Sequence, residues 1–260
     1  MNKEQMEFFM EILDASLPRL GPGSDTSTAN ALDMLFPRRA NRTSGADTAG
    51  LRILDLGCGN GAQTIRLALL GAGKILAVDN YQPYLEELRR RAETNGVSER
   101  IEPCLRDMRD LKMDSGSFDL IWSEGALYFL GFFEGLEVCR ELLKPGGSLA
   151  VSELSWLRAD PPEECRQYIS SEYPAIADVS ANLAAIRARG YEVVGHFSLP
   201  PSDWWEPYYN PLERRLESFR AKHAADPMRA EIIECVQAEI DFYRTYSSYY
   251  GYEFYLLRRG

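Results

Sequence analysis

The sequence has few of the residues on which several common kinds of site depend. It contains only two histidines, His196 and His223, and neither directly follows a predicted site strand, so we expect both to be structural or on the surface. Its five cysteines are widely spaced and include no Cys-x-x-Cys pair, which argues against a disulfide framework and against a zinc site. Basic residues number 29 against 39 acidic ones, for a net charge of −10. That balance disfavours nucleic acids and anionic membranes as partners.

Long apolar segments are also lacking, because no stretch is long and apolar enough to span a bilayer. The first thirteen residues are helix-like and acidic, so we expect no signal peptide and a cytoplasmic protein. The basic clusters at Arg38-Arg39 and at residues 89–91 are interpreted as solvated surface charge. A hydrophobic content of 45% is nevertheless ample for the core of one α/β domain with insertions.

What the sequence does have is a glycine-rich loop directly after a short apolar run, within residues 51–61. Four of the first six positions are leucine or isoleucine, as in a central strand covered on both faces. Gly57, Gly59 and Gly61 follow at once, and glycines at the end of a strand let a ligand lie directly against the backbone. Residues 62–70 have helix-forming composition. The pattern predicts a small-molecule site at the switch point of an open α/β sheet.

Two acidic residues bear on the identity of this ligand. The glycine pattern also satisfies the looser dinucleotide pattern G-x-G-x-x-A, but Asp55 lies close to where a pyrophosphate would sit, and like charges repel. A carboxylate there suits an ammonium or a sulfonium instead. Asp79 ends the next predicted strand, 22 residues after Gly57, close to the offset at which an acid binds ribose hydroxyls. Asp79 therefore supports an adenosine-type ligand without choosing between NAD and S-adenosylmethionine.

The stretch Asp55-Leu56-Gly57-Cys58-Gly59-Asn60-Gly61 resembles the first motif of the class I S-adenosylmethionine-dependent methyltransferases, and the likeness extends over most of the chain. It is most similar to a bacterial group of small-molecule methyltransferases with Gly-Pro-Gly-Ser, Trp-Ser-Glu-Gly-Ala and Tyr-Tyr-Gly-Tyr segments, found here at residues 21–24, 122–126 and 249–252. The resemblance implies S-adenosyl-L-methionine as cofactor and S-adenosyl-L-homocysteine as product. It also implies an α/β fold: a Rossmann-like, doubly wound, seven-stranded sheet, mostly parallel with an antiparallel last strand, helices on both faces and an N-terminal helical lid.

The whole chain, residues 1–260, is interpreted as one methyltransferase domain. Its expected parts are an N-terminal helical cap (1–45), a cofactor-binding core (50–200), a helical insert or cap (201–248) and an edge strand (249–260). Within the first part, apolar spacing predicts a helix over residues 3–17, and Ser24 or Thr26 is expected to cap a second helix that ends at Phe36. Residues 40–50 are polar and small, which predicts a linker.

The resemblance places cofactor contacts in the loops after the first four strands. Asp107 would accept from the adenine amino group and Met108 would pack on the ring, although Asp107 could instead cap a local turn. Asn80 would lie near the adenine. Arg19 could pair with the methionine carboxylate or be an ordinary surface arginine. The expected cofactor-binding set is Arg19, Asp55, Gly57, Cys58, Gly59, Asp79, Asn80, Asp107, Met108, Ser123 and Glu124.

Glu124 and Tyr128 follow the fourth predicted strand and are the catalytic candidates, because side chains there should face the transferable methyl group; either could instead be structural. This loop is not the Asn-Pro-Pro-Tyr of base-modifying DNA methyltransferases. More than fifty residues separate the last two predicted strands, and connections that long are usually functional. The aromatic residues of this insert form either a packing cap or a wall over the acceptor. The expected substrate contacts are Tyr128, Glu153, Trp156, Trp204, Trp205, Tyr208 and Tyr209.

Together these features predict methyl transfer from S-adenosylmethionine to a small molecule. An aromatic wall with Glu124, Glu153 or Glu206 would suit an amine, since aromatic faces stabilise a nearby cation by ~0.5–2 kcal/mol. Two alternatives remain open: an NAD(P)-dependent oxidoreductase, and a non-catalytic protein that binds S-adenosylmethionine. No macromolecular partner is indicated, and a homodimer is compatible with the sequence.

Overall fold

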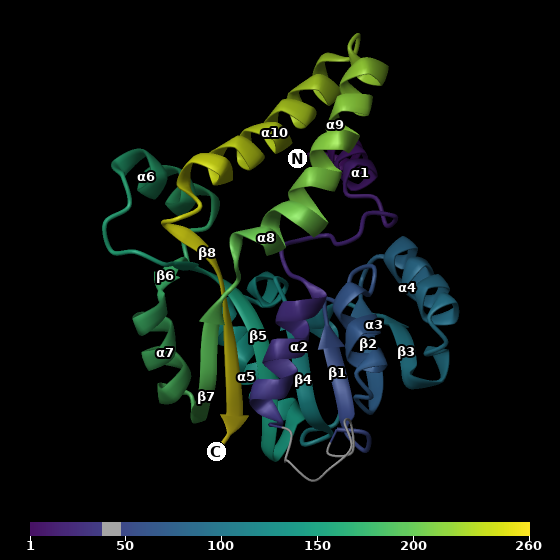
Figure 1. Cartoon of the computed structure of the whole chain (residues 1–260), viewed down its shortest axis with the longest axis vertical. Helices are drawn as coiled ribbons and strands as arrows, with labels where there is room; N and C mark the ends of the chain where they lie inside the picture. The colour runs from purple at the N-terminus through teal and green to yellow at the C-terminus, as the bar shows by residue number, and fades with distance from the viewer. Residues whose placement is uncertain (38–47) are drawn as a thin grey trace.

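The computed structural model describes residues 1–37 and 48–260, in which a mixed sheet carries helices on both faces (Figure 1). The strand order is β3-β2-β1-β4-β5-β8-β7, with the short β6 paired to β5 off this path. The strands are β1 (Arg52–Leu56), β2 (Lys74–Asp79), β3 (Ile101–Leu105), β4 (Phe118–Glu124), β5 (Leu143–Trp156), β6 (Ala177–Asp178), β7 (Tyr191–Ser198) and β8 (Tyr250–Arg259). Most of the expected linker and Arg38-Arg39 lie outside the described residues.

Ten α-helices and four short helical turns are assigned within those described ranges. The α-helices are α1 (Lys3–Ile12), α2 (Asp25–Leu35), α3 (Ala62–Leu69), α4 (Gln82–Thr94), α5 (Phe132–Leu142), α6 (Glu163–Glu172), α7 (Val179–Ala188), α8 (Pro201–Trp204), α9 (Asn210–His223) and α10 (Pro227–Tyr246). The turns are η1 (Ser98–Arg100), η2 (Met108–Asp110), η3 (Leu127–Leu130) and the π-helical η4 (Trp205–Tyr209).

The sheet confirms the expected strand directions. The central strands β1 to β5 pair in parallel, whereas β8 runs antiparallel to both β5 and β7. The strands β5 and β8 stay paired from Ser148↔Arg258 to Trp156↔Tyr250. The predictions missed α6, which starts after two prolines and buries Cys165 and Ile169 four residues apart.

Hydrophobic side chains form three clusters that fix these layers. Alternation along β1 sends Ile53 toward the layer of α2, α3 and α4, and Leu54 toward the layer of α5 and α7. The third cluster joins α1 and α6 to the helices of the insert, α8 to α10. Figure 1 shows these helices above the edge at which the parallel strands end, so that they roof the carboxyl edge of the sheet. None of the helices in the described ranges is both long enough and apolar enough to cross a membrane.

The N-terminal segment lies on the glycine loop, although its first helix is shorter than predicted. Helix α1 ends at Ile12, and the Ser16 amide then donates to the Asp14 carboxylate in a turn. Asn60, in the glycine loop, donates its side-chain amide to the carbonyl of Leu17 at 2.7 Å, and Arg91 of α4 donates to the same carbonyl at 2.7 Å. As one of the two expected caps, Ser24 accepts the Ser27 amide at the start of α2.

Candidate cofactor and acceptor site

The loops after β1, β3 and β4 meet at Gly57. Its φ is +70°, and a Cβ added there would lie 2.4 Å from Ala126 Cβ and 3.3 Å from Met108 Cε. Gly59 also has a positive φ, +52°, and an added Cβ would come within 3.1 Å of the Leu20 side chain. The two glycines are therefore required by conformation and by close approach, and they leave a cradle that a side chain would fill.

Asp79 lies at the mouth of this cradle, where the spacing from Gly57 predicts a ribose-binding acid. Its Oδ2 accepts the Gly59 amide at 2.9 Å and its Oδ1 accepts the Tyr81 amide at 2.9 Å. Burial raises the pKa of the carboxyl, against the lowering effect of these bonds. Each carboxylate oxygen can accept a further bond. The half-buried Asp79 thus keeps acceptor capacity for hydroxyls, and Asn80 beside it is exposed.

Asp55 supports the loop from beneath. It is 0% exposed, and its carboxylate accepts hydrogen bonds from Thr64 Oγ1 at 2.6 Å and from Gln63 Nε2 at 3.3 Å, which fixes the first turn of α3. Burial raises its pKa to about 7, and the nearby carboxylates of Glu124 and Asp79 add to the effect. With no accessible surface, Asp55 can affect a ligand only through its charge and through the shape of the loop.

Two other predicted cofactor residues, Cys58 and Ser123, are buried in the same region. The Cys58 thiol has its pKa raised far above the usual range by burial, so a reactive thiolate is disfavoured. The Ser123 hydroxyl donates to the carbonyl of Leu56 at 3.0 Å, which ties β4 to β1 at their carboxyl ends. Both side chains shape the site.

Asp107 caps a local turn, which was the alternative to adenine binding. Its Oδ1 accepts the Arg109 amide at 2.8 Å and so caps η2, while its Oδ2 lies 2.9 Å from the Arg109 guanidinium. These bonds lower its pKa. The cap also positions Met108, whose side chain reaches Gly57. Binding of adenine by Asp107 and Met108 stays a prediction.

Arg19 and Glu124 are bound to each other. Arg19 is 6% exposed, so the surface alternative is wrong, and its Nη1 lies 2.8 Å from Glu124 Oε2. The other oxygen of Glu124 accepts hydrogen bonds from Thr28 Oγ1 at 2.7 Å and from Trp122 Nε1 at 2.9 Å. Both oxygens of Glu124 are engaged by the chain itself, which argues against the catalytic role expected of it. Recognition of the methionine carboxylate by Arg19 stays a prediction.

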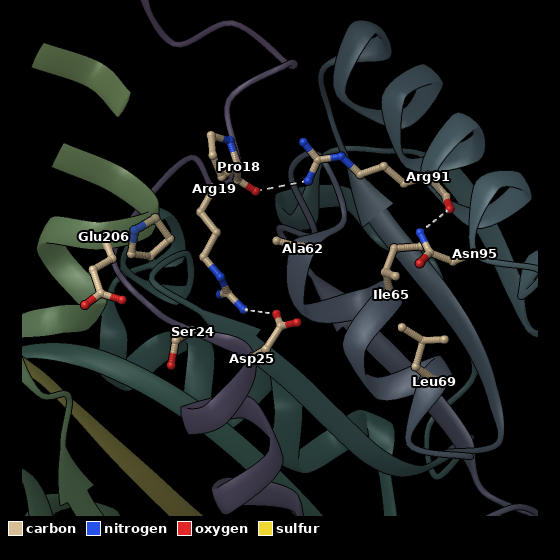
Figure 2. A pocket seen from close by; sticks show the side chains of 11 residues that line it. Pro18, Arg19, Ser24, Asp25, Ala62, Ile65, Leu69, Arg91, Asn95 and Glu206 are labelled. Carbon is tan, nitrogen blue, oxygen red and sulfur yellow. Dashed lines mark hydrogen bonds and ion pairs between the residues drawn. The ribbon is translucent and has the colours of Figure 1, made fainter. Parts of the chain in front are cut away.

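A pocket of about 510 Å³ lies on the outer side of the N-terminal segment (Figure 2). Arg19 and Asp25 point toward each other at one side of it, and Arg91 donates to the Pro18 carbonyl at the other. Glu206, one of the acids considered for an amine acceptor, lines this pocket. Asp79, Asp107 and Met108 do not, so this hollow is distinct from the glycine-loop cradle.

The aromatic residues of the insert were expected to form either a packing cap or a wall over the acceptor, and they do not all behave alike. Trp204 is 4% exposed and stacks on Tyr243 with ring centres 4.1 Å apart, so it packs as part of the cap, as does the buried Tyr209. Half-buried Trp205 lies under the Arg244 guanidinium. Tyr208 is buried as well, but its hydroxyl has no hydrogen-bond partner among the described residues. Trp204 Nε1 is also without a partner in the described chain, so these two polar atoms of the aromatic segment are available to a ligand.

Glu153 and Tyr128 lie near the carboxyl edge of the sheet, and both contact Tyr173. Glu153 is 2% exposed, its Oε1 accepts a hydrogen bond from Tyr173, and its Oε2 has no partner within the described ranges. Burial raises its pKa to about 7. Tyr128 is 37% exposed, and its ring centre lies 6.2 Å from that of Tyr173. Trp156, at the end of β5, is half-buried near Arg166.

Three residues of this region escaped the sequence-based prediction. Tyr173 follows the unpredicted α6 and binds Glu153. Glu239, in α10, accepts a hydrogen bond from Tyr209 at 3.0 Å. Tyr252 has its hydroxyl 3.5 Å from the position of a Cβ on Gly125, and it belongs to the Tyr-Tyr-Gly-Tyr segment. That segment was the available signal for Tyr252, whereas Glu239 lies in an unremarkable polar stretch.

The histidines and the acids do not form a further centre in the described chain. His196 Nδ1 lies 2.5 Å from Glu253 Oε1 in the outer strands, and His223 packs edge-on against Phe8. Across residues 1–37 and 48–260, no group of three or more His, Cys, Asp or Glu side chains is arranged to hold a metal ion. The expected structural roles of the two histidines agree with these positions.

Residues 53–147 match the family described as "Methyltransferase domain". The chain is 28% identical over 174 residues to the sterol 24-C-methyltransferase of Aspergillus fumigatus, covering 63% of this chain and 45% of the relative. It is 33% identical over 156 residues to the demethylmenaquinone methyltransferase of Clavibacter sepedonicus, covering 60% of this chain and 61% of the relative. It thus spans about half the length of the sterol methyltransferases that it matches.

The fold is shared with a solved S-adenosylmethionine-dependent methyltransferase from Thiobacillus denitrificans in complex with S-adenosyl-L-homocysteine. The TM-score is 0.80 at 20% sequence identity, covering 100% of this chain and 99% of that chain. The family match and the shared fold support a class I S-adenosylmethionine-dependent methyltransferase. They favour S-adenosylmethionine over a nicotinamide cofactor, and the narrower bacterial group stays a prediction.

Proposed function

We propose that this protein transfers a methyl group from S-adenosylmethionine to a small-molecule acceptor, and that the acceptor is an amine. The observation that carries the proposal is that the glycine cradle and the tyrosine-rich region beneath the insert are adjacent. Gly57 lies against Ala126 and Met108, and Gly125, next to Ala126, lies against Tyr252. A cofactor site next to an enclosed region roofed by helices suits a small acceptor, because the roof excludes water and large partners.

The residues of the cradle fit the cofactor. Gly57 and Gly59 leave the space that a Cβ would fill, and the carboxylate of Asp79 retains lone pairs for ribose hydroxyls. When bound, S-adenosylmethionine supplies an electrophilic methyl group on a sulfonium, and the negative charges of Asp55 and Asp79 suit that positive centre. The N-terminal segment, held down by Asn60 and Arg91, closes the cradle from above.

The acceptor side favours an amine because it carries an unpaired acid. Glu153 has a free, buried Oε2 and a pKa raised to about 7, so near neutral pH it can take up the proton that a protonated amine must lose before its lone pair can react. An acceptor lone pair on nitrogen then needs orientation and little further chemistry from the protein. Glu153, rather than the catalytic candidate Glu124, is the proton acceptor that we propose.

The proposal is tested by incubating the protein with S-adenosylmethionine and a panel of amines, phenols, carboxylic acids and thiols, with S-adenosyl-L-homocysteine detected by mass spectrometry. We expect turnover with amines. With saturating amine it should rise as the pH increases from 6 to 8, because Glu153, with its pKa of about 7, accepts a proton only when ionised. Binding of S-adenosyl-L-homocysteine without turnover of any acceptor would instead support the non-catalytic alternative.

A further inference from the structure

Glu239 reaches from α10 into the tyrosine-rich region beneath the insert. Its Oε1 accepts a hydrogen bond from Tyr209 at 3.0 Å. By accessible surface it is an exposed residue, yet burial raises the pKa of its carboxyl. Tyr128 combines the same two properties, with 37% of its surface accessible and a pKa raised to about 12 by burial. Both side chains are thus accessible to solvent although protein surrounds them, and we call the space that they border the recess. Trp204 links the Glu239 side of this region to Tyr252, with its ring centre 5.8 Å from that of Tyr209 and 5.4 Å from that of Tyr252.

No basic side chain of residues 1–37 or 48–260 offsets the charge of Glu239. Besides burial, its pKa is affected by the Tyr209 hydroxyl, which lowers it, and by Glu172, which raises it. No basic side chain in the described ranges offsets the charge of Glu153 either, because its pKa is shifted only by burial and by the hydrogen bond from Tyr173. An ionised carboxylate surrounded by protein without a cation is costly, and a bound cation relieves that cost.

The charges of Glu239 and Glu153 both affect two tyrosines of this region. The charge of each raises the pKa of Tyr128 and of Tyr252. Glu153 is almost completely buried with an unpartnered Oε2, and the Tyr252 hydroxyl has no hydrogen-bond partner among the described residues either. Because that hydroxyl lies 3.5 Å from the Cβ position of Gly125, the recess adjoins the loop after β4, on the cofactor side.

We infer that the recess between Glu239 and Tyr252 is the subsite for a positively charged nitrogen of the acceptor, with Glu239 as the residue that selects for charge. The inference rests on the proposed function and adds to it: the acceptor enters as a cation, a protonated or alkylated amine. Tyrosine faces and the Glu239 carboxylate supply complementary attraction, and the two act together in an enclosed space. Neutral acceptors of equal shape leave Glu239 unpaired and bind more weakly.

Isothermal titration in the presence of saturating S-adenosyl-L-homocysteine tests this inference with two probes of equal shape. Choline carries a permanent positive charge, and 3,3-dimethylbutan-1-ol is its neutral counterpart. We expect choline to bind at least about tenfold more tightly than the alcohol, a difference of about 1.4 kcal/mol. Glu239→Gln should remove most of that preference. The variant keeps an acceptor for the Tyr209 hydroxyl, and its melting temperature reports whether it folds.

Glu231→Gln is the matched control, because Glu231 is an exposed acid on the same helix. It should leave the choline preference unchanged. Equal binding of the two probes, a choline affinity that Glu239→Gln does not alter, or no choline binding at millimolar concentrations would each overturn the inference. Failure of the wild type to bind S-adenosyl-L-homocysteine would overturn the proposed function instead, and the choline titration, run without it, would still decide the cation site.

Discussion

Arg19 and Glu124 form a buried ion pair, 105 residues apart in sequence, that joins the N-terminal segment to the carboxyl end of β4. Arg19 Nη1 lies 2.8 Å from Glu124 Oε2, and both side chains are almost fully buried. Asp25 lies 3.5 Å from the same guanidinium but is largely exposed. The position of the N-terminal segment over the glycine loop therefore depends on a charge at the carboxyl end of β4.

Removing one partner of this pair should be strongly destabilising. Glu124→Gln leaves the Arg19 guanidinium buried beside the exposed Asp25, and uncompensated buried charges of this kind cost about 3–5 kcal/mol. We expect a loss of about 3 kcal/mol in the free energy of unfolding, measured by urea denaturation. Replacing both partners, as Arg19→Met with Glu124→Gln, should recover part of it because no charge is then left unpaired.

The exposed pair of Arg158 and Asp160 provides the control for that measurement. Its atoms are 2.9 Å apart, similar to the buried pair, but both side chains are largely accessible. Asp160→Asn should therefore cost less than about 1 kcal/mol. A similar cost for Glu124→Gln and Asp160→Asn would contradict the role given to the buried pair.

Asp55 should make stability depend on pH in the direction set by its raised pKa. The pKa is about 7 in the fold against about 3.9 in an unfolded chain, so the folded state binds this proton more tightly. The contribution of Asp55 to stability is then most favourable below pH 4, declines as the pH rises to 7 and stays low above it. We expect Asp55→Asn to be more stable than wild type by roughly 1–3 kcal/mol at pH 8, with little difference at pH 4.

Urea denaturation at the two pH values checks this, with Asp110→Asn as the control, because Asp110 is an exposed acid beside Lys112. The control should give a difference near zero at both pH values. A stability difference for Asp55→Asn that is the same at pH 4 and pH 8 would show that burial does not raise this pKa.

Alanine substitutions at Gly57 and Gly96 distinguish the cost of backbone strain from the cost of a steric clash. Both have φ near +70°, but a Cβ on Gly57 would lie 2.4 Å from Ala126, while a Cβ on Gly96 would meet nothing within 4 Å. Gly96→Ala should cost only the strain of a left-handed residue, roughly 1–2 kcal/mol. Gly57→Ala should cost more and weaken binding of S-adenosyl-L-homocysteine at least about tenfold, since the cradle is then filled. Denaturation and calorimetry measure the two effects; equal losses in both variants would contradict the close approach.

The parts of this site that could be predicted from sequence are those fixed by local spacing. The three glycines after an apolar run and Asp79 at the end of the next strand needed no knowledge of tertiary structure, because consecutive strands of such a sheet bring their carboxyl ends together. The strand directions followed from the same pattern and the resemblance. Ser24 was likewise recognisable as a helix cap from its position after a glycine-proline break.

The rest depended on contacts between distant segments. Glu124 was predicted to be catalytic from its place after a strand, but its partner Arg19 comes from an irregular segment that no periodicity marks. Glu239, which we propose lines the acceptor subsite, lies on α10, and this helix crosses above the sheet edge (Figure 1). Its contact with Tyr209, 30 residues away, could not be predicted from its local sequence. Trp204 was equally ambiguous, since packing on Tyr243 and lining a ligand site require the same aromatic composition.

The account is tested most directly by calorimetric titration of the wild type and of Asp79→Ala with S-adenosyl-L-homocysteine, with NAD in a parallel cell. We predict micromolar binding of S-adenosyl-L-homocysteine and none of NAD. Asp79→Ala should weaken the former by ~1–3 kcal/mol, because hydrogen bonds from the ribose hydroxyls to a carboxylate are lost. Binding of NAD without S-adenosyl-L-homocysteine, or an affinity that Asp79→Ala leaves unchanged, would contradict the placement of the cofactor at the glycine loop.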